Sequence, residues 1–213
     1  MAYATVADLR DEGVTEAQAS NTRLDLLIDE ATKIIDRVTG WFFEPRRLTL
    51  HLDGRGTPSL ELPFPLIRLY ELLVNDFDFA INEFNIVNVG APVQPGFVSP
   101  RLSLIDGRVF PKRRDNITIN GLWGYTETDG TENGRTPLEI RRACMLLVIR
   151  MLTPLSDIAG RADVLNQWRI VEERTRDQSY KLAQTEQTTH LVGDPEIDLI
   201  LARYCRPVEI GAV

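Results

Sequence analysis

The sequence has little of what enzymes use to bind metal ions or to attack a substrate. Its 213 residues include two histidines, His51 and His190, and two cysteines, Cys144 and Cys205. It contains no His-Glu-x-x-His or Cys-x-x-Cys pair, no Gly-x-Ser-x-Gly turn and no phosphate-binding loop, which are the motifs that hold zinc, activate a serine or cradle a nucleotide. The sequence therefore predicts no catalytic residues, no metal ligands and no cofactor, and so a protein that is not an enzyme.

Long apolar runs are missing as well. The longest, ACMLLVI at residues 143–149, is far shorter than the roughly 20 residues that span a bilayer. The first twelve residues already include acidic side chains and no apolar segment of the kind found in a secretion signal. We therefore expect a soluble protein that is assembled in a cytoplasm and has no membrane partner.

Positive charge is in the minority, with 24 basic and 31 acidic side chains and a formal net charge of −7. Such a chain has no general attraction to nucleic acid. One local exception is the segment RVFPKRRD, which gathers Arg108, Lys112, Arg113 and Arg114. These four residues are candidates for an inter-subunit or phosphate contact, although a solvated turn is the simpler interpretation.

Hydrophobic content of 43% is ample for a buried core. The spacing of the apolar residues predicts a first helix over residues 22–39. Thr22 and Asp25 approximate a capping box at its start, and Gly40 is placed to end it. A shorter helical turn is expected around residues 6–10. One stripe of the longer helix carries its apolar side chains: Leu24, Leu27, Ile28, Ala31, Ile34, Ile35 and Val38.

Two further helices are predicted nearer the carboxy terminus. The first, over residues 137–152, has Thr136 as its N-cap and Pro137 at its first position. The second, over about residues 195–205, has Asp194 as its N-cap. Between these helices, residues 156–192 give no clear pattern, and their polar part is either an exposed arm or an extended strand.

Strand-like alternation replaces helical spacing between the first two long helices. Leucines alternate with polar residues over 48–52 and 60–62, on either side of the turn signal Asp53-Gly54, which predicts a β-hairpin. Further strands are expected at residues 66–74, 84–89, 102–105, 109–110 and 116–125. Asp106-Gly107 marks a second turn.

These elements predict an α+β fold, in which a helical bundle carries an inserted antiparallel β domain. Residues 1–40 and 127–213 would form the helical domain, and residues 41–126 the β domain. The long helices of the bundle would be those at about 22–39, 137–152 and 195–205.

With the elements in this order, the chain resembles the head-tail connector (adaptor) family of tailed bacteriophages and gene-transfer particles. Residues 77–115 depart from the resemblance. The segments that carry it are LIDEATKIIDRVTGWFFEP (27–45), LHLDGRGTPSLELPFPLI (50–67), INGLWGY (119–125), PLEIRRACMLLVIRML (137–152) and GDPEIDLILARYCRP (193–207).

The resemblance implies a structural virion protein of the neck, at the head-tail interface. Its copies would form a homo-oligomeric ring, usually a dodecamer, that docks to the portal protein and links it to a stopper or tail-completion protein. DNA would pass through the lumen without specific binding, because an excess of acidic side chains repels phosphates. The apolar tail after the last helix would reach into the portal, which gives this set of docking residues: Tyr204, Arg206, Pro207, Val208, Ile210 and Val213.

Two alternatives remain open from the sequence. The first is a carbohydrate- or protein-binding β module on a helical base, suggested by Trp41, Trp123 and Tyr125. The second is an enzyme that uses two carboxylates of the β region as acid and base, although nothing in the sequence selects the pair.

Overall fold

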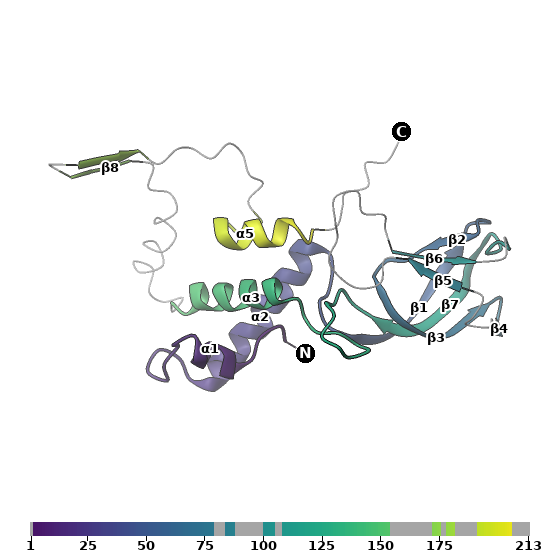
Figure 1. The fold of residues 1–213 in the computed structure, drawn as a ribbon, viewed down its shortest axis with the longest axis horizontal. Coiled ribbons are helices and arrows are strands. Elements are labelled where there is room, and N and C mark those ends of the chain that lie inside the picture. The colour runs from purple at the N-terminus through teal and green to yellow at the C-terminus, as the bar shows by residue number, and fades with distance from the viewer. Residues whose placement is uncertain are drawn as a thin grey trace.

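In the computed structural model the helices gather at one end of the protein, and the strands that lie between α2 and α3 in the sequence gather at the other (Figure 1). The structure describes residues 2–78, 84–87, 100–104, 108–153, 172–175, 178–181 and 191–205. The described helices are α1 (Val6–Asp11), α2 (Asn21–Thr39), α3 (Leu138–Met151) and α5 (Pro195–Ala202). The strands are β1 (Arg46–Gly54), β2 (Ser59–Glu61), β3 (Leu66–Val74), β4 (Phe77–Asp78), β5 (Phe84–Val87), β6 (Arg101–Leu104), β7 (Arg113–Trp123), β8 (Glu172–Thr175) and β9 (Gln178–Lys181).

Helix α2 confirms the first predicted helix, but it begins with a different cap. The Ser20 side chain, rather than that of Thr22, accepts a hydrogen bond from the Arg23 backbone N–H. Serine in an extended conformation is an effective N-cap, and this one adds one residue to the start of the helix. Gly40 ends the helix as predicted, with φ of 73°, a left-handed conformation that suits glycine.

The two later helices are shorter than predicted, α3 by one residue at each end and α5 at its carboxy-terminal end. Pro137 itself is the residue before α3 and there is no side-chain cap, so the assignment of Thr136 as N-cap is wrong. Asp194 does cap α5, because its carboxylate accepts hydrogen bonds from two backbone N–H groups of the first turn. The α5 helix ends at Ala202, earlier than predicted, and continues as a turn to Cys205.

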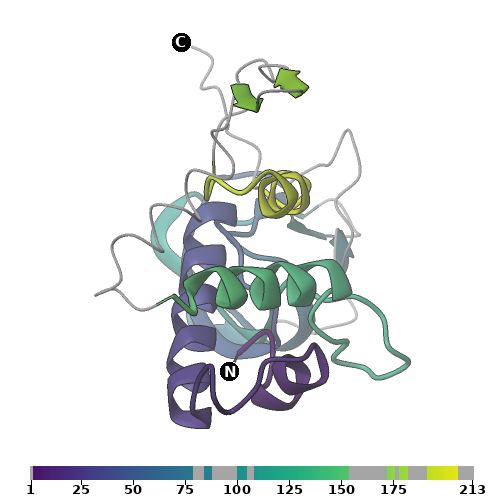
Figure 2. The same cartoon turned by 90° about the vertical axis from the view of Figure 1, so that its left-hand side faces the viewer.

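The predicted bundle of long helices is wrong. The four helices within the described residues have 6, 19, 14 and 8 residues, and α3 crosses α2 instead of running alongside it (Figure 2). The fold is a mixed one, in which the helices and the antiparallel sheets each have a core, and the segments that lead into and out of the sheets add Trp41, Phe43 and Tyr125 to the helical core.

Strands β1 to β7 form two antiparallel sheets of order β1-β7-β3-β4 and β2-β6-β5, and we call these seven strands the β unit. The predicted hairpin between β1 and β2 is wrong. Strand β1 pairs with β7, from Arg46 opposite Trp123 to Gly54 opposite Arg113, whereas β2 pairs with β6. Alternating leucines indicate which face of a strand is buried, but they do not indicate which strand lies beside it. The hairpin was predicted from the turn signal Asp53-Gly54, which does not determine the pairing.

The other strand predictions were closer to the structure. Strand β3 has the predicted bounds, and β5, β6 and β7 lie within three residues of theirs. Residues 109–110 are not a strand. The predicted Asp106-Gly107 turn lies outside the described residues. Within the polar arm, β8 and β9 pair with each other as a two-stranded antiparallel sheet.

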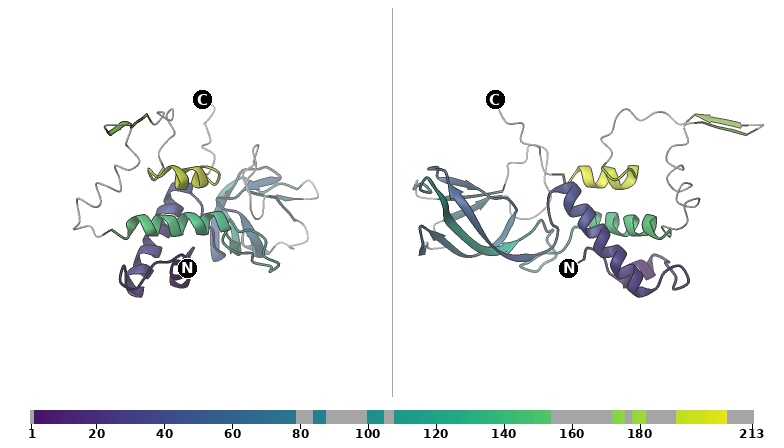
Figure 3. Two further views of the ribbon diagram at one scale, coloured as in Figure 1. Left: turned by 60° about the vertical axis from the view of Figure 1, so that its left-hand side comes forward. Right: turned by 180° about the vertical axis from the view of Figure 1, so that it is seen from behind.

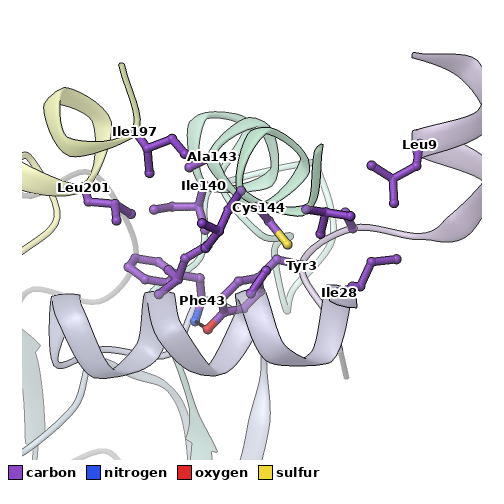
Figure 4. Packing of buried hydrophobic residues seen from close by; sticks show 14 of the residues in the cluster. Tyr3, Leu9, Ile28, Phe43, Ile140, Ala143, Cys144, Ile197 and Leu201 are labelled. Atoms are coloured by element: carbon purple, nitrogen blue, oxygen red, sulfur yellow. Dashed lines mark hydrogen bonds between the residues drawn. The ribbon is translucent and has the colours of Figure 1, made fainter. Parts of the chain in front are cut away.

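Two hydrophobic cores hold the protein together. The core of the β unit joins both sheets through Leu60, Leu102, Ile119 and Trp123, all of which are buried. The second core joins the helices. Figure 4 shows side chains from α1, α2, α3 and α5 converging there, among them Leu9, Ile28, Ile140, Cys144 and Leu201.

Candidate functional site

The segment Trp41-Phe42-Phe43 connects the two cores. Because side chains alternate sides along an extended chain, Trp41 and Phe43 enter the helical core while Phe42 enters the core of the β unit. The other connection repeats this arrangement, since Trp123 belongs to the β unit and Tyr125 to the helical core. A hydrogen bond of 2.9 Å from the Tyr125 N–H to the Phe42 carbonyl ties the two connections together.

An aromatic cluster forms where these connections meet the last helix, and we call Tyr3, Phe43, Tyr125 and Tyr204 the aromatic junction. The Tyr204 ring lies 5.5 Å from the Phe43 ring and 5.6 Å from that of Tyr125, both in edge-to-face geometry. Phe43 contacts Tyr3 and Tyr125 in the same way. Rings at these distances and angles attract each other beyond their simple burial, so the junction joins the amino terminus, the segments before and after the β unit, and the turn after α5.

Polar contacts on α3 fix the orientation of Tyr204. Its hydroxyl donates a hydrogen bond of 3.2 Å to Glu139, which also pairs with Arg203 at 3.1 Å. Burial, together with the negative charge of Glu139, raises the pKa of Tyr204 above its ordinary value. The hydroxyl therefore stays protonated and remains a donor at neutral pH.

A second polar network lies on the α2 side of the junction. Tyr3 donates a hydrogen bond to Asp36, and the Phe43 backbone N–H donates one of 2.9 Å to the Tyr3 oxygen. Arg46 pairs with Asp36 at 3.1 Å and with the buried Glu44 at 2.9 Å. Burial, reinforced by the Asp36 contact, raises the pKa of Tyr3, which keeps that hydroxyl protonated as well. The network attaches the start of β1 to the end of α2.

Two buried aspartates hold the approach to α5. The Asp198 carboxylate accepts hydrogen bonds from three consecutive backbone N–H groups, those of Leu191, Val192 and Gly193, at 2.8 to 3.3 Å. Asp194, besides capping α5, pairs with Arg150 of α3 at 2.6 Å. Asp194 thus ties the start of α5 to α3, and Asp198 holds the segment that leads into α5.

Comparison with known proteins supports this fold. No protein-family model matches the sequence, and no curated protein matches it. A chain of a solved structure described as "Neck of empty GTA particle computed with C6 symmetry" matches it with a TM-score of 0.53 and 18% sequence identity, over 76% of this chain and 87% of that chain. At this identity the likeness shows a shared fold.

The structure places one predicted docking residue, Tyr204, inside the protein at 6% exposure. The others, Arg206, Pro207, Val208, Ile210 and Val213, lie outside the described residues. They follow directly after Cys205, whose thiol lies 3.8 Å from the Val38 carbonyl of α2. The carboxy-terminal segment thus begins at the aromatic junction.

The predicted basic residues lie at the tip of the β unit, which comprises residues 53–57 and 108–115. Arg108, Lys112, Arg113 and Arg114 are all exposed there. They share the tip with two carboxylates, because the Asp115 N–H donates a hydrogen bond of 2.7 Å to Asp53. The tip therefore presents mixed charge, a weaker attraction for phosphate than the sequence alone suggests.

Three observations concern what the described residues could bind. The aromatic side chains that suggested a binding platform, Trp41, Trp123 and Tyr125, are at most 2% exposed. No group of three or more histidine, cysteine or acidic side chains is placed to hold a metal ion within the described part of the chain. In that same part, no helix has the length and apolar character needed to cross a membrane.

Sequence reasoning missed two features of the surface and the core. Leu26 and Leu199 are exposed, at 67% and 65%, on α2 and α5. For Leu26 a signal existed, because it falls off the buried stripe of its helix. To predict that Trp41, Phe42 and Phe43 enter two different cores, one would have to know which distant residues they contact, and the sequence does not give this.

Proposed function

We propose that this chain is a structural protein of the neck of a tailed phage or phage-like particle. The observation that carries the proposal is the fold, which is shared with a chain of a GTA particle neck over most of both chains. The contacts of the described residues add support, since their aromatic and charged clusters join helices and strands to one another.

Within the neck, we propose the adaptor position: a ring of copies that docks to the portal protein and links it to a stopper or tail-completion protein. The neighbouring neck was computed with C6 symmetry, and a six-fold axis is compatible with twelve copies as well as six. A dodecamer fits both this symmetry and the resemblance of the sequence to connector proteins.

The carboxy-terminal segment is proposed as the portal-docking element, with Tyr204 as its anchor. The aromatic junction holds the end of α5 rigidly, so the residues that follow start from a fixed position and lose less entropy on binding. Val208, Ile210 and Val213 supply the apolar contacts. Burying three such side chains contributes on the order of 3–6 kcal/mol per copy before ordering costs, and a ring repeats that contribution.

The proposed ring also provides a channel for DNA. Twelve copies would carry about −84 formal charges, from −7 per chain. Negative charge along a lumen repels phosphates and lets the genome slide. We therefore expect no binding to duplex DNA in a fluorescence-anisotropy titration at 150 mM salt.

Removing the tail tests the docking step directly. A chain lacking residues 208–213 should unfold at the same urea concentration as the full chain but lose co-purification with the portal of its own particle. A control of full length, with Val208, Ile210 and Val213 replaced by serine, should behave like the truncation, whereas Glu209→Gln should bind normally. Portal binding by the truncated chain at wild-type strength would disprove the docking role.

A further inference from the structure

Helices α2 and α3 pack against each other through one face, and the opposite face of each carries exposed side chains. On α2 the buried residues include Leu24, Ile28 and Ile35, and on α3 they include Ile140 and Leu147. The exposed residues lie about half a turn away around each helix. In Figure 1, α3 lies in front of α2, and in the right panel of Figure 3, seen from behind, α2 lies in front of α3.

The outer face of α2 combines one apolar side chain with a group of carboxylates. Leu26 is 67% exposed at its centre. Asp25, Asp29 and Glu30 are exposed around it, and Lys33 forms an ion pair of 2.6 Å with Asp29. We define this outer face of α2 by Thr22, Asp25, Leu26, Asp29, Glu30, Lys33 and Arg37.

The outer face of α3 has the complementary composition. Leu138 and Ile149 are exposed at 50% and 37%, at the two ends of the helix. Arg142 stands between them with its side chain 65% exposed, and it pairs with Glu196 at the edge of the face. We define this outer face of α3 by its exposed residues Leu138, Arg142 and Ile149.

From this arrangement we infer that the outer face of α2 in one copy packs against the outer face of α3 in the next copy. The two faces lie on opposite sides of the helical layer, which is the geometry that a head-to-tail ring requires. Leu26 meets the apolar residues of α3, and Arg142 meets the carboxylates of α2. The inference rests on the proposed ring and names the surfaces that form it.

Complementary charge and apolar contact point to a second copy of this chain as the occupant. A closed ring needs two different patches on each copy that fit each other. The α2 face carries three carboxylates against two basic side chains, and the α3 face carries Arg142, so the pairing sets an excess of carboxylates against a guanidinium around apolar side chains. The exposed apolar residue of α5, Leu199, is 65% exposed but has no counterpart in this pairing, so it serves as a matched control.

Reversing the charges on the outer faces of α2 and α3 tests whether these faces pair. Two full-length variants are prepared, one with Asp29→Arg and Glu30→Arg, the other with Arg142→Glu. Mass photometry measures how many copies assemble, for each protein alone and with the portal. Each variant alone should lose at least 90% of the multimer formed by the wild type.

Mixing the two variants in equal amounts should restore the multimer. In an alternating ring the reversed α2 face meets the reversed α3 face, and the unchanged faces meet each other, so every contact is again complementary. Restoration also shows that both variants fold. Leu26→Asp should abolish assembly, and Leu199→Asp should leave it at the wild-type level.

The outcomes separate this inference from the proposed function. If the wild type forms a ring and the mixture fails to recover it, or if the single variants assemble normally, the named faces are wrong and the ring stands. If the wild type forms no multimer either alone or with the portal, the ring is wrong and this interface falls with it.

Discussion

Replacing Tyr204 with alanine tests whether the aromatic junction stabilises the fold in addition to positioning the end of α5. The ring is 6% exposed and contacts Phe43 and Tyr125 with centroid separations of 5.5 and 5.6 Å. Removing a buried aromatic side chain leaves a cavity and costs about 3–5 kcal/mol. Tyr204→Ala should therefore lower the free energy of unfolding by about 4 kcal/mol, within that range.

The matched variant Tyr204→Phe keeps the ring and removes only the hydroxyl. It loses the hydrogen bond of 3.2 Å to Glu139, which is worth about 1 kcal/mol because Glu139 is partly solvated. Urea unfolding followed by tryptophan fluorescence measures both variants. A loss for Tyr204→Ala no greater than that for Tyr204→Phe would refute the assignment of the ring to the core.

Three further predictions follow from other contacts. Arg46→Ala removes one partner of the buried Glu44 and one of Asp36, and it should lower the free energy of unfolding by about 2–3 kcal/mol, measured in urea. An unchanged midpoint would show that the network is not stabilising. Burial raises the pKa of the Cys144 thiol to about 12, so at pH 8 it should react with a thiol reagent only at the rate of unfolding, and rapid labelling in native buffer would contradict its placement. Burial raises the pKa of Asp8, but hydrogen bonds from the Thr5 backbone and from Arg141 outweigh burial, so the pKa in the folded protein is lowered. The contribution of the Asp8 carboxylate to the free energy of unfolding is therefore fully present above its unfolded pKa of about 3.9. It is lost as the pH falls through the lower, folded pKa. Unfolding of Asp8→Asn should accordingly vary less with pH below about 4 than that of the wild type, and equal pH profiles would remove Asp8 from the account.

The sequence predicted best the features that depend on near neighbours along the chain. Asp194 followed by Pro195 specifies a helix start through its own backbone contacts, and Gly40 specifies a helix end through its left-handed conformation. Strand β3 was predicted with its full bounds because its apolar residues and its boundaries are both local signals.

Features that depend on distant partners were not predictable in the same way. The leucines of β1 alternate whether the strand beside it is β2 or β7, so the sequence could not exclude the wrong hairpin. The helical periodicity of α2 and α3 shows that each has a buried face but not that the two helices cross. A bundle was predicted from the presence of three helices, but the presence of helices does not determine the angle at which they pack.

The candidate site was partly predictable. The sequence indicated that the chain ends in an apolar segment after a capped helix, and it drew attention to Tyr204. It did not indicate that Tyr204 is enclosed by Phe43 and Tyr125 from the two connections to the β unit, because those residues lie about 80 to 160 positions away along the chain.

The mass of the purified chain in solution, measured with and without the portal of its particle, tests the central claim most directly. One copy has a mass of 24.1 kDa. The account predicts that the portal collects a defined set of copies, twelve in the dodecamer proposed here. A chain that remains a single copy at micromolar concentration in the presence of the portal would contradict the claim that this is a ring-forming protein of the neck.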